Sequence, residues 1–319
     1  MHKMDILVGY TGFVGSNLHG QHEFCACFNS ANITDAFGLG ADLCVYAGVR
    51  AEKFTADRFP EQDMTHINGA LHNIRMINAA KLVLISTVDV IPQQSGSLFE
   101  STPYEPDRLT PYGRNRLYLE HEARKLCPGA HIIRLPGLFG KGLKKNFIYD
   151  AVNFIPAMLK GEKFRELRGK LAWADGDLLD RFYSRDANGF FRLAPDITGE
   201  DRAALRDIFK SLGFSALDFT DSRAAFQFYN LDYLWAHIKF ALENNIRLLH
   251  LAVEPVSARE VCKAITGADF INETAGSPPD YSFFKTEYAG KLRGGGGYIF
   301  NRRQVLSDIC RQFSHAEQR

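Results

Sequence analysis

The feature that most constrains the fold of this chain is a glycine-rich turn close to its start. Gly9, Gly12 and Gly15 form a G-x-x-G-x-x-G pattern directly after the apolar run 5–8. A short apolar run that ends at glycine is typical of a buried parallel strand. Glycine permits a tight strand-to-helix turn and lets the backbone approach a pyrophosphate. The sequence therefore predicts a strand, a phosphate-binding turn and a helix whose N-terminus faces the phosphates.

Strand-like and helix-like segments alternate through the first half of the chain. The further expected strands are at 24–28, 43–47, 81–86 and 132–135. Ile67, Leu71, Ile74 and Ile77 recur at helical spacing, and another helix is expected over about 112–125. This alternation is typical of a parallel sheet covered by helices on both faces. We therefore predict an α/β chain with a Rossmann-type doubly wound parallel sheet.

The second half of the chain is less regular. It contains a strand-like run at 247–253 and helix-like segments at 200–212, 257–265 and 305–313. The charged stretch from about 161 to 221 is longer than a simple connector. We predict a dinucleotide-binding domain formed by 1–140 plus about 222–253. A smaller mixed α/β substrate-binding domain is expected over about 141–221 plus 254–319.

Composition excludes several classes of function. The net charge of the 319 residues is +1, so no global field attracts nucleic acid. No stretch approaches the length of about 18 apolar residues that a membrane span needs, and the start does not resemble a signal peptide. The six cysteines include no C-x-x-C pair, so we predict no metal site and a cytoplasmic location.

The residues after the second expected strand bear on the choice of cofactor. An acidic residue there favours NAD and a basic one favours NADP, but this chain has Asn29 and Ser30. Both can hydrogen-bond a hydroxyl or a phosphate, and both are also common turn residues. Arg50 follows the third strand and could pair with a 2′-phosphate, or it could be a solvated loop residue. The choice between NAD and NADP stays open.

The order of these and further segments resembles the extended short-chain dehydrogenase/reductase superfamily, in particular its NAD-dependent epimerases and dehydratases of nucleotide sugars. The segments are the glycine turn, Tyr46-Ala47-Gly48, Asn68, Ser86-Thr87-Val88-Asp89-Val90, Pro111-Tyr112-Gly113, Arg134-Leu135-Pro136-Gly137-Leu138-Phe139-Gly140 and Asn146. They extend over most of the chain. Their order is specific to the superfamily but not to one reaction within it.

The resemblance implies a set of site residues. The cofactor-binding residues would be Gly9, Thr11, Gly12, Phe13, Val14, Gly15, Asn29, Ser30, Ala47, Gly48, Val49, Arg50, Asn68, Ser86, Pro136 and Leu138. The catalytic residues would be Thr87, Tyr112 and Arg116, and Thr87, Lys144, Lys145 and Asn146 would bind the substrate. It also implies a nucleotide-sugar substrate and a homodimer. Three lysines at 141–145 suit a diphosphate, although a solvated basic loop explains them equally.

Arg116 departs from the family's Tyr-x-x-x-Lys pair. Tyrosine is a poor base at neutral pH, and a nearby cation lowers its pKa. Residues four apart share one helix face, so a cation at 116 would lie beside Tyr112. Arginine keeps the charge but changes its geometry. We therefore predict an NAD(P)-dependent epimerase, dehydratase or reductase of nucleotide sugars. The alternatives are a dinucleotide-binding protein without redox turnover and a reductase of a non-sugar carbonyl.

Overall fold

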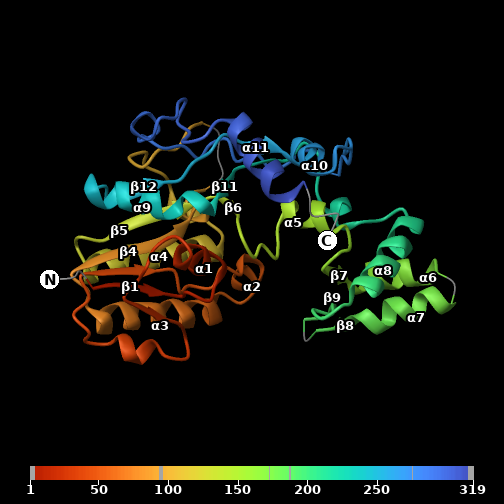
Figure 1. Ribbon diagram of the computed structural model, residues 1–319, viewed down its shortest axis with the longest axis horizontal. Helices are drawn as coiled ribbons and strands as arrows, with labels where there is room; N and C mark the ends of the chain where they lie inside the picture. Colours follow the sequence, from red (N-terminus) through yellow and green to blue (C-terminus); the bar gives the residue numbers. More distant parts are fainter. Residues whose placement is uncertain (1–3, 93–95, 172, 187, 275, 315–319) are drawn as a thin grey trace. The chain divides into compact units, whose positions relative to one another are not determined.

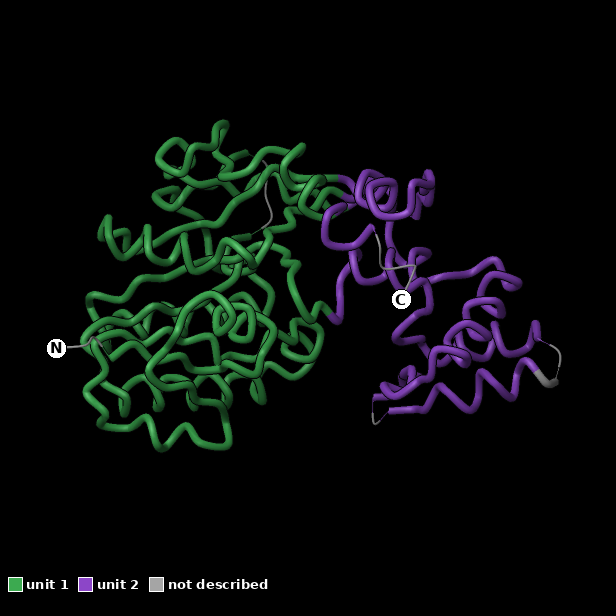
Figure 2. Tube along the Cα trace, viewed as in Figure 1, with its two compact units in different colours: residues 1–143, 225–256, 279–309 green, residues 144–224, 257–278, 310–319 purple. Residues whose placement is uncertain are grey.

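The computed structural model describes residues 4–92, 96–171, 173–186, 188–274 and 276–314. The chain divides into two compact units, coloured separately in Figure 2. The first unit contains residues 1–143, 225–256 and 279–309, and the second contains 144–224, 257–278 and 310–319. Across the described ranges, no helix combines the length and the apolar character that crossing a membrane requires.

A six-stranded parallel sheet forms the centre of the first unit, as Figure 1 shows. Its strand order is β12-β5-β4-β3-β1-β2. The strands are β1 (Asp5–Val8), β2 (Ala26–Phe28), β3 (Leu43–Tyr46), β4 (Lys81–Thr87), β5 (His131–Leu135) and β12 (Leu248–His250). The order reverses at β1, where the first crossover goes to β2 and the second to β3. The predicted doubly wound parallel sheet is therefore confirmed.

Helices cover both faces of this sheet. The helices of the unit include α1 (Phe13–His19), α3 (Pro60–Ile77), α4 (Pro111–Leu126) and α9 (Leu234–Glu243). One core joins Ile67 and Ile74 of α3 and Leu119 of α4 to Ile6 and Leu84 of the sheet. The alternate strand residues point the other way, and Figure 1 shows α9 on the face opposite α3.

The C-terminal segment 279–309 belongs with the first unit, whereas the sequence placed it in the substrate-binding part. Its backbone is bonded to the segments that follow two central strands, β4 and β12. Leu98 N donates to Phe283 O, and Ile299 N donates to Ala252 O. These long-range bonds have no local sequence signal. The cofactor and substrate roles of the two units stay predictions.

The second unit has its own core. A three-stranded antiparallel sheet of order β7-β9-β8 packs with helices around Leu159, Phe164, Leu205 and Phe209. Its elements are α5 (Phe147–Asn153), β7 (Met158–Lys160), α6 (Gly161–Gly169), α7 (Trp173–Phe182), β8 (Tyr183–Arg185), β9 (Phe190–Leu193), α8 (Gly199–Ser211) and α10 (Ala258–Thr266). Ser257 and Glu260 form the expected capping box at α10.

The remaining elements are short or lie near the C-terminus. They are α2 (Lys53–Arg58), β6 (Gly137–Phe139), β10 (Ala225–Phe226), β11 (Phe228–Asn230), β13 (Val256–Ser257) and α11 (Arg302–Phe313). β6 pairs in parallel with β11, so the chain after β5 continues beside residues 228–230. Helix α2 has no counterpart in the sequence prediction, and it contributes to the site described next.

Candidate active site

The glycine turn has the geometry that a pyrophosphate cradle needs. Gly9 has a φ of +89°, and a Cβ there would lie 2.6 Å from the Ala47 carbonyl oxygen. A Cβ on Gly15 would collide with the Gly9 carbonyl oxygen. Both positions therefore require glycine. The turn leads into α1 at the carboxyl end of β1, so the residues present fit a dinucleotide at the edge where open α/β sheets bind ligands.

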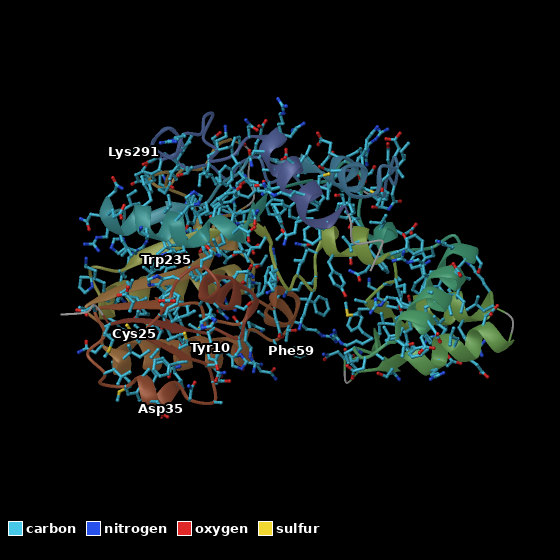
Figure 3. All side chains as sticks on the ribbon, viewed as in Figure 1. Tyr10, Cys25, Asp35, Phe59, Trp235 and Lys291 are labelled. Carbon is cyan, nitrogen blue, oxygen red and sulfur yellow. The ribbon has the colours of Figure 1, made fainter. Side chains whose placement is uncertain are left out.

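The neighbouring positions of the turn remain accessible. Thr11 is exposed, Phe13 and Val14 are half-buried, and the Tyr10 ring, labelled in Figure 3, lies 6.0 Å from the His19 ring. The first N–H groups of a helix have no partner within the helix. Those at the start of α1 therefore face the same edge as the carboxyl end of β1.

The expected ribose-binding residues lie beyond the adjoining strands. Asn29 follows β2 and uses its side-chain oxygen to accept from Ala31 N at 2.9 Å, so it forms a turn of its own. Ser30 and Arg50 are exposed, whereas Ala47 and Val49 are half-buried. Gly48 adjoins Val8, because a Cβ added there would lie 3.1 Å from the Val8 side chain. This arrangement leaves the choice between NAD and NADP open.

Thr87 ends β4 and is tied to Asp89. Its hydroxyl donates to Asp89 Oδ2 at 3.0 Å and accepts from Asp89 N at 3.2 Å, which caps the short 3-10 helix η2 (Val88–Val90). Asp89 in turn forms an ion pair with Lys53 of α2, with an Nζ–Oδ1 distance of 2.5 Å. Sequence reasoning missed Asp89 and Lys53 as site residues. The short helix that carries Lys53 has no apolar periodicity that would predict it.

Helix α4 brings Tyr112 to the same strand end. Thr110 caps the helix, and Asp57 Oδ1 accepts from Tyr112 N at 2.9 Å. Gly113 is in contact with the backbone of η2, since a Cβ on it would collide with the Asp89 carbonyl oxygen. The Tyr-Gly pair therefore allows the first turn of α4 to lie directly against the segment after Thr87.

Arg116 occupies the expected helix face but is engaged elsewhere. Its guanidinium forms two bonds of 2.8 Å with the Asp63 carboxylate of α3, and Nη2 donates to Arg50 O at 2.7 Å. Its Cζ lies 4.4 Å from the centre of the Tyr112 ring. Arg116 is only 4% exposed. The cation therefore stacks against the tyrosine, and Asp63 neutralises its charge.

The protonation state of Tyr112 follows from this environment. Burial raises the pKa of the Tyr112 phenol, the Arg116 guanidinium lowers it, and the Asp89 carboxylate raises it again. The net shift is upward. A Tyr-Lys pair would be expected to have the opposite effect, so the Tyr112 phenol stays protonated at neutral pH.

Other predicted cofactor residues lie in different surroundings. Ser86 donates to Glu120 Oε1, and Glu120 is also held by Arg134, so Ser86 belongs to a buried polar network under the strand ends. Asn68 is exposed on α3, where it lines a surface pocket with Tyr118 and Glu122. That pocket lies on the outer face of α3 and α4, and neither Tyr112 nor Arg116 lines it. Pro136 is buried, and Leu138 lies in β6.

The predicted substrate residues Lys144, Lys145 and Asn146 belong to the second unit. The two lysines are exposed. Asn146 has a φ of +110° and caps α5 through Tyr149 N at 3.2 Å. A positive φ at a residue other than glycine is strained, and such strain is concentrated at functional sites. Their role in substrate binding stays a prediction.

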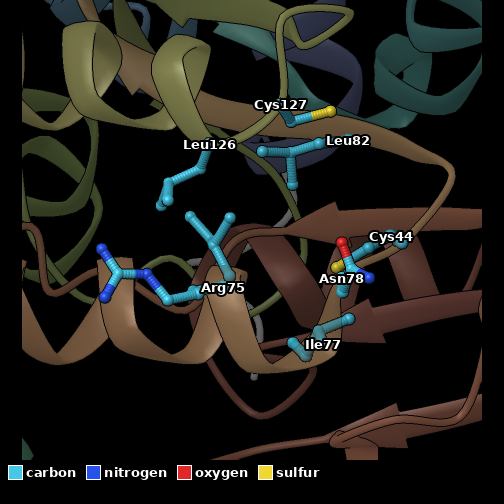
Figure 4. A pocket seen from close by; sticks show the side chains of 9 residues that line it. Cys44, Arg75, Ile77, Asn78, Leu82, Leu126 and Cys127 are labelled. Carbon is cyan, nitrogen blue, oxygen red and sulfur yellow. The ribbon is translucent and has the colours of Figure 1, made fainter.

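A separate pocket lies at the opposite end of the strands. Figure 4 shows it between Arg75 and Asn78 of the α3 end and Cys127 after α4, with Cys44 of β3 beside it. Ligands of open α/β sheets bind at the carboxyl ends of the strands, so this pocket is not the candidate site. In the described ranges, no group of three or more His, Cys, Asp or Glu residues could hold a metal ion.

Comparison with known proteins gives the class of fold. No family model matches the sequence, and no curated protein matches it. The dTDP-4-dehydrorhamnose reductase of Yersinia enterocolitica is similar in structure, with a TM-score of 0.62 at 13% identity over 98% of this chain and 99% of that one. The Bacillus anthracis reductase in complex with NADP has a TM-score of 0.60 at 14% identity over 98% of each chain.

A third similar structure is that of a protein with a different reaction, an epimerase. UDP-glucose-4-epimerase from Stenotrophomonas maltophila, with bound NAD and formylated UDP-arabinopyranose, has a TM-score of 0.59 at 15% identity over 99% of this chain and 98% of that one. At these identities the likeness is one of fold. The chain has the fold of extended short-chain dehydrogenases/reductases, as the sequence resemblance predicted.

Proposed function

We propose that this protein is an NAD(P)-dependent epimerase, dehydratase or reductase of a nucleotide-activated sugar. The observation that carries the proposal is the backbone contact of Gly113 with Asp89, which holds Tyr112 against the strand end at Thr87. The glycine turn lies at the same carboxyl edge of the sheet. The NADP complex of the Bacillus anthracis reductase and the NAD complex of the Stenotrophomonas maltophila epimerase support this class of cofactor.

The glycine turn, Tyr112 and Arg116 would have separate roles in this reaction. Gly9, Gly12 and Gly15 would hold the pyrophosphate, and the bound nicotinamide would exchange hydride with a carbon of the sugar. Tyr112 would donate a hydrogen bond or a proton to the sugar oxygen, because its phenol is protonated at neutral pH. Arg116 would keep the Tyr112 ring in place by stacking, and would not contact the ribose, since its guanidinium is bound by Asp63 and the Arg50 carbonyl.

Binding and turnover measurements test this proposal. Purified protein would be titrated with NAD(H) and NADP(H), then assayed with a panel of nucleotide sugars. Tyr112→Phe should lower turnover about 10²–10⁴-fold, the usual contribution of a general acid or base. Tyr118→Phe is the matched control, because Tyr118 lies on the same helix and is 42% exposed. Failure to bind either cofactor in the micromolar range would refute the proposal.

Arg116 favours a second candidate, a dinucleotide-binding protein without redox turnover. The ion pair with Asp63 removes the free cation that would activate Tyr112. Cofactor binding without turnover of any nucleotide sugar, and with no effect of Tyr112→Phe, would support this candidate. Good cofactor binding with turnover of a simple carbonyl compound would instead indicate a non-sugar reductase.

We also propose a cytoplasmic homodimer. Met76 of α3 and Tyr118 of α4 are exposed, at 42% each, and they extend the apolar character of these two helices to the surface. Burial of such side chains favours association. Sedimentation velocity should give a dimer mass, and Tyr118→Asp should shift the population toward the monomer. A monomer at all concentrations would contradict this proposal.

A further inference from the structure

The starting observation is that the cation expected beside Tyr112 is unavailable. Both edges of the Arg116 guanidinium are occupied, one by the two Asp63 oxygens and the other by the Arg50 carbonyl. The Arg116 guanidinium is therefore held in place by these bonds and is not available to assist a proton transfer. If proton transfer occurs at Thr87 and Tyr112, another group must accept the proton.

A chain of three polar side chains ends at Thr87. Thr87 Oγ1 donates to Asp89 Oδ2 at 3.0 Å, and Asp89 Oδ1 is 2.5 Å from Lys53 Nζ. The three side chains come from β4, η2 and α2. Lys53 and Asp89 are 44% and 21% exposed, so the chain connects Thr87 to solvent.

The direction of these hydrogen bonds restricts what Thr87 can do. Its only proton points to Asp89, so its oxygen is an acceptor toward any ligand. A sugar hydroxyl would therefore donate to Thr87, while the Tyr112 phenol, a donor, would bind the same or a neighbouring sugar oxygen. Thr87 is thus set to accept the single proton that the reaction moves, while the Tyr112 phenol stabilises the sugar oxygen by a hydrogen bond.

We propose that Asp89 is the proton acceptor of the reaction, acting through Thr87, and that Lys53 is the positioning residue that holds its carboxylate. This inference rests on the proposed function. When the sugar is oxidised, the proton of its hydroxyl passes to Thr87 Oγ1 as the Thr87 proton passes to Asp89 Oδ2. The sugar C–H bond breaks at the same time, and its electron pair leaves as hydride to oxidised nicotinamide. A carbonyl remains, and reduction follows the reverse path.

Several charged or titratable groups face Asp89. They are Lys53 of α2, Tyr112 of α4 and Tyr281 of the C-terminal segment, and beyond them Asp57 interacts with Lys53 and Arg116 with Tyr112. Burial lowers the pKa of Lys53, but Asp89, with smaller contributions from Tyr281 and Asp57, raises it, and the net shift is upward, so the ammonium stays charged across the working range of pH. Burial raises the pKa of Tyr281, and the Lys53 cation only partly offsets this. Lys53 is therefore the only cation among these groups that pairs with Asp89.

The test uses the full-length protein with Asp89→Asn, Asp89→Glu and Lys53→Met. Each is assayed for oxidation of a nucleotide sugar between pH 5 and pH 10, with NAD⁺ or NADP⁺ binding as an independent readout. Asp107→Asn and Lys239→Met are the controls, because both side chains are exposed and lie on other elements of the first unit. Thermal melting checks that every variant is folded.

Asp89→Asn should lower turnover about 10²–10⁴-fold with cofactor binding unchanged, since an amide cannot accept the proton. Asp89→Glu should restore part of the rate. Lys53→Met should move the acid limb of the pH profile to higher pH, because a carboxylate without its cation holds a proton more tightly. A merely structural role would not move that limb.

Two results would overturn the inference and leave the proposed function intact. One is turnover of Asp89→Asn within about threefold of the natural protein at every pH, and the other is an unmoved acid limb in Lys53→Met. Cofactor binding by the natural protein without any sugar turnover would overturn the inference and favour the binding protein. No cofactor binding would overturn both proposals.

Discussion

The ion pair between Arg116 and Asp63 leads to a prediction that separates its structural role from a catalytic one. Both side chains are nearly buried, at 5% and 8% exposure, and they share two bonds of 2.8 Å. Removing one partner leaves the other as an uncompensated buried charge, which costs about 3–5 kcal/mol. Arg116→Met and Asp63→Leu should each lower the free energy of unfolding by about that amount.

The double variant should be much closer to the natural protein. Replacing a buried ion pair by apolar residues of similar size is often nearly neutral, so the two single effects should not add. With a nearly neutral double variant, the coupling energy from the double-mutant cycle approaches the sum of the two single effects, about 6–10 kcal/mol. Urea unfolding followed by circular dichroism measures each step. Additive single effects would show that the guanidinium is not bonded to Asp63 and would refute the reasoning.

Arg116→Lys completes this test. A lysine ammonium cannot form the two parallel bonds to the Asp63 carboxylate, nor stack as a plane on Tyr112. We expect a loss of about 2–3 kcal/mol in unfolding free energy, because charge-assisted hydrogen bonds contribute about 1.5–3 kcal/mol each, and no gain in turnover. A tenfold rise in turnover with unchanged stability would mean that Arg116 is a poor substitute for a catalytic lysine.

Three further outcomes are expected. Gly15→Ala should abolish cofactor binding, because its Cβ would collide with the Gly9 carbonyl oxygen. The control Gly69→Ala should bind cofactor normally, since a Cβ there meets open space on α3. Calorimetric titration compares the two variants, and equal affinities would contradict the role of the glycine turn as a pyrophosphate cradle. Burial and the Arg134 cation lower the pKa of His250 to about 3. As pH falls, the unfolded state therefore takes up the proton first, and the free energy of unfolding should fall from about pH 6.5 toward pH 3. His250→Asn should flatten that slope in urea unfolding, and an unchanged slope would contradict this prediction. Burial raises the pKa of Asp150 to about 7, so its carboxyl group destabilises the fold increasingly as pH rises from about 4 through 7. Asp150→Asn should therefore raise the melting temperature more at pH 8 than at pH 5. An equal rise at both pH values would contradict this prediction.

Local sequence patterns predicted most of the central sheet. Apolar runs gave all six strands, although β2 begins at Ala26 and not at Phe24. The Phe24 ring packs against His22 and Trp235, with ring-centre distances of 4.6 and 5.4 Å. This packing comes from a helix more than 200 residues away, so a single apolar run cannot reveal it.

The candidate site was predictable only in part, for a similar reason. Helical spacing placed Arg116 beside Tyr112, as the structure has it. The partner of Arg116 is Asp63, which lies on another helix and is 53 residues away in sequence. No pattern along α4 indicates that partner. Lys53 was missed because α2 has a single buried residue, Ala56, and thus no apolar stripe.

The contact of Gly113 with the Asp89 carbonyl has a consequence for how this site can evolve. It is a contact of main chain with main chain, so it fixes the backbone at Tyr112 independently of the side chain one turn later, which stacks on the tyrosine ring. A substitution at position 116 therefore leaves the backbone at Tyr112 in place, although it removes the stacking on the ring and the ion pair with Asp63. An arginine at 116 is compatible with this anchored helix start, because the anchor lies at Gly113.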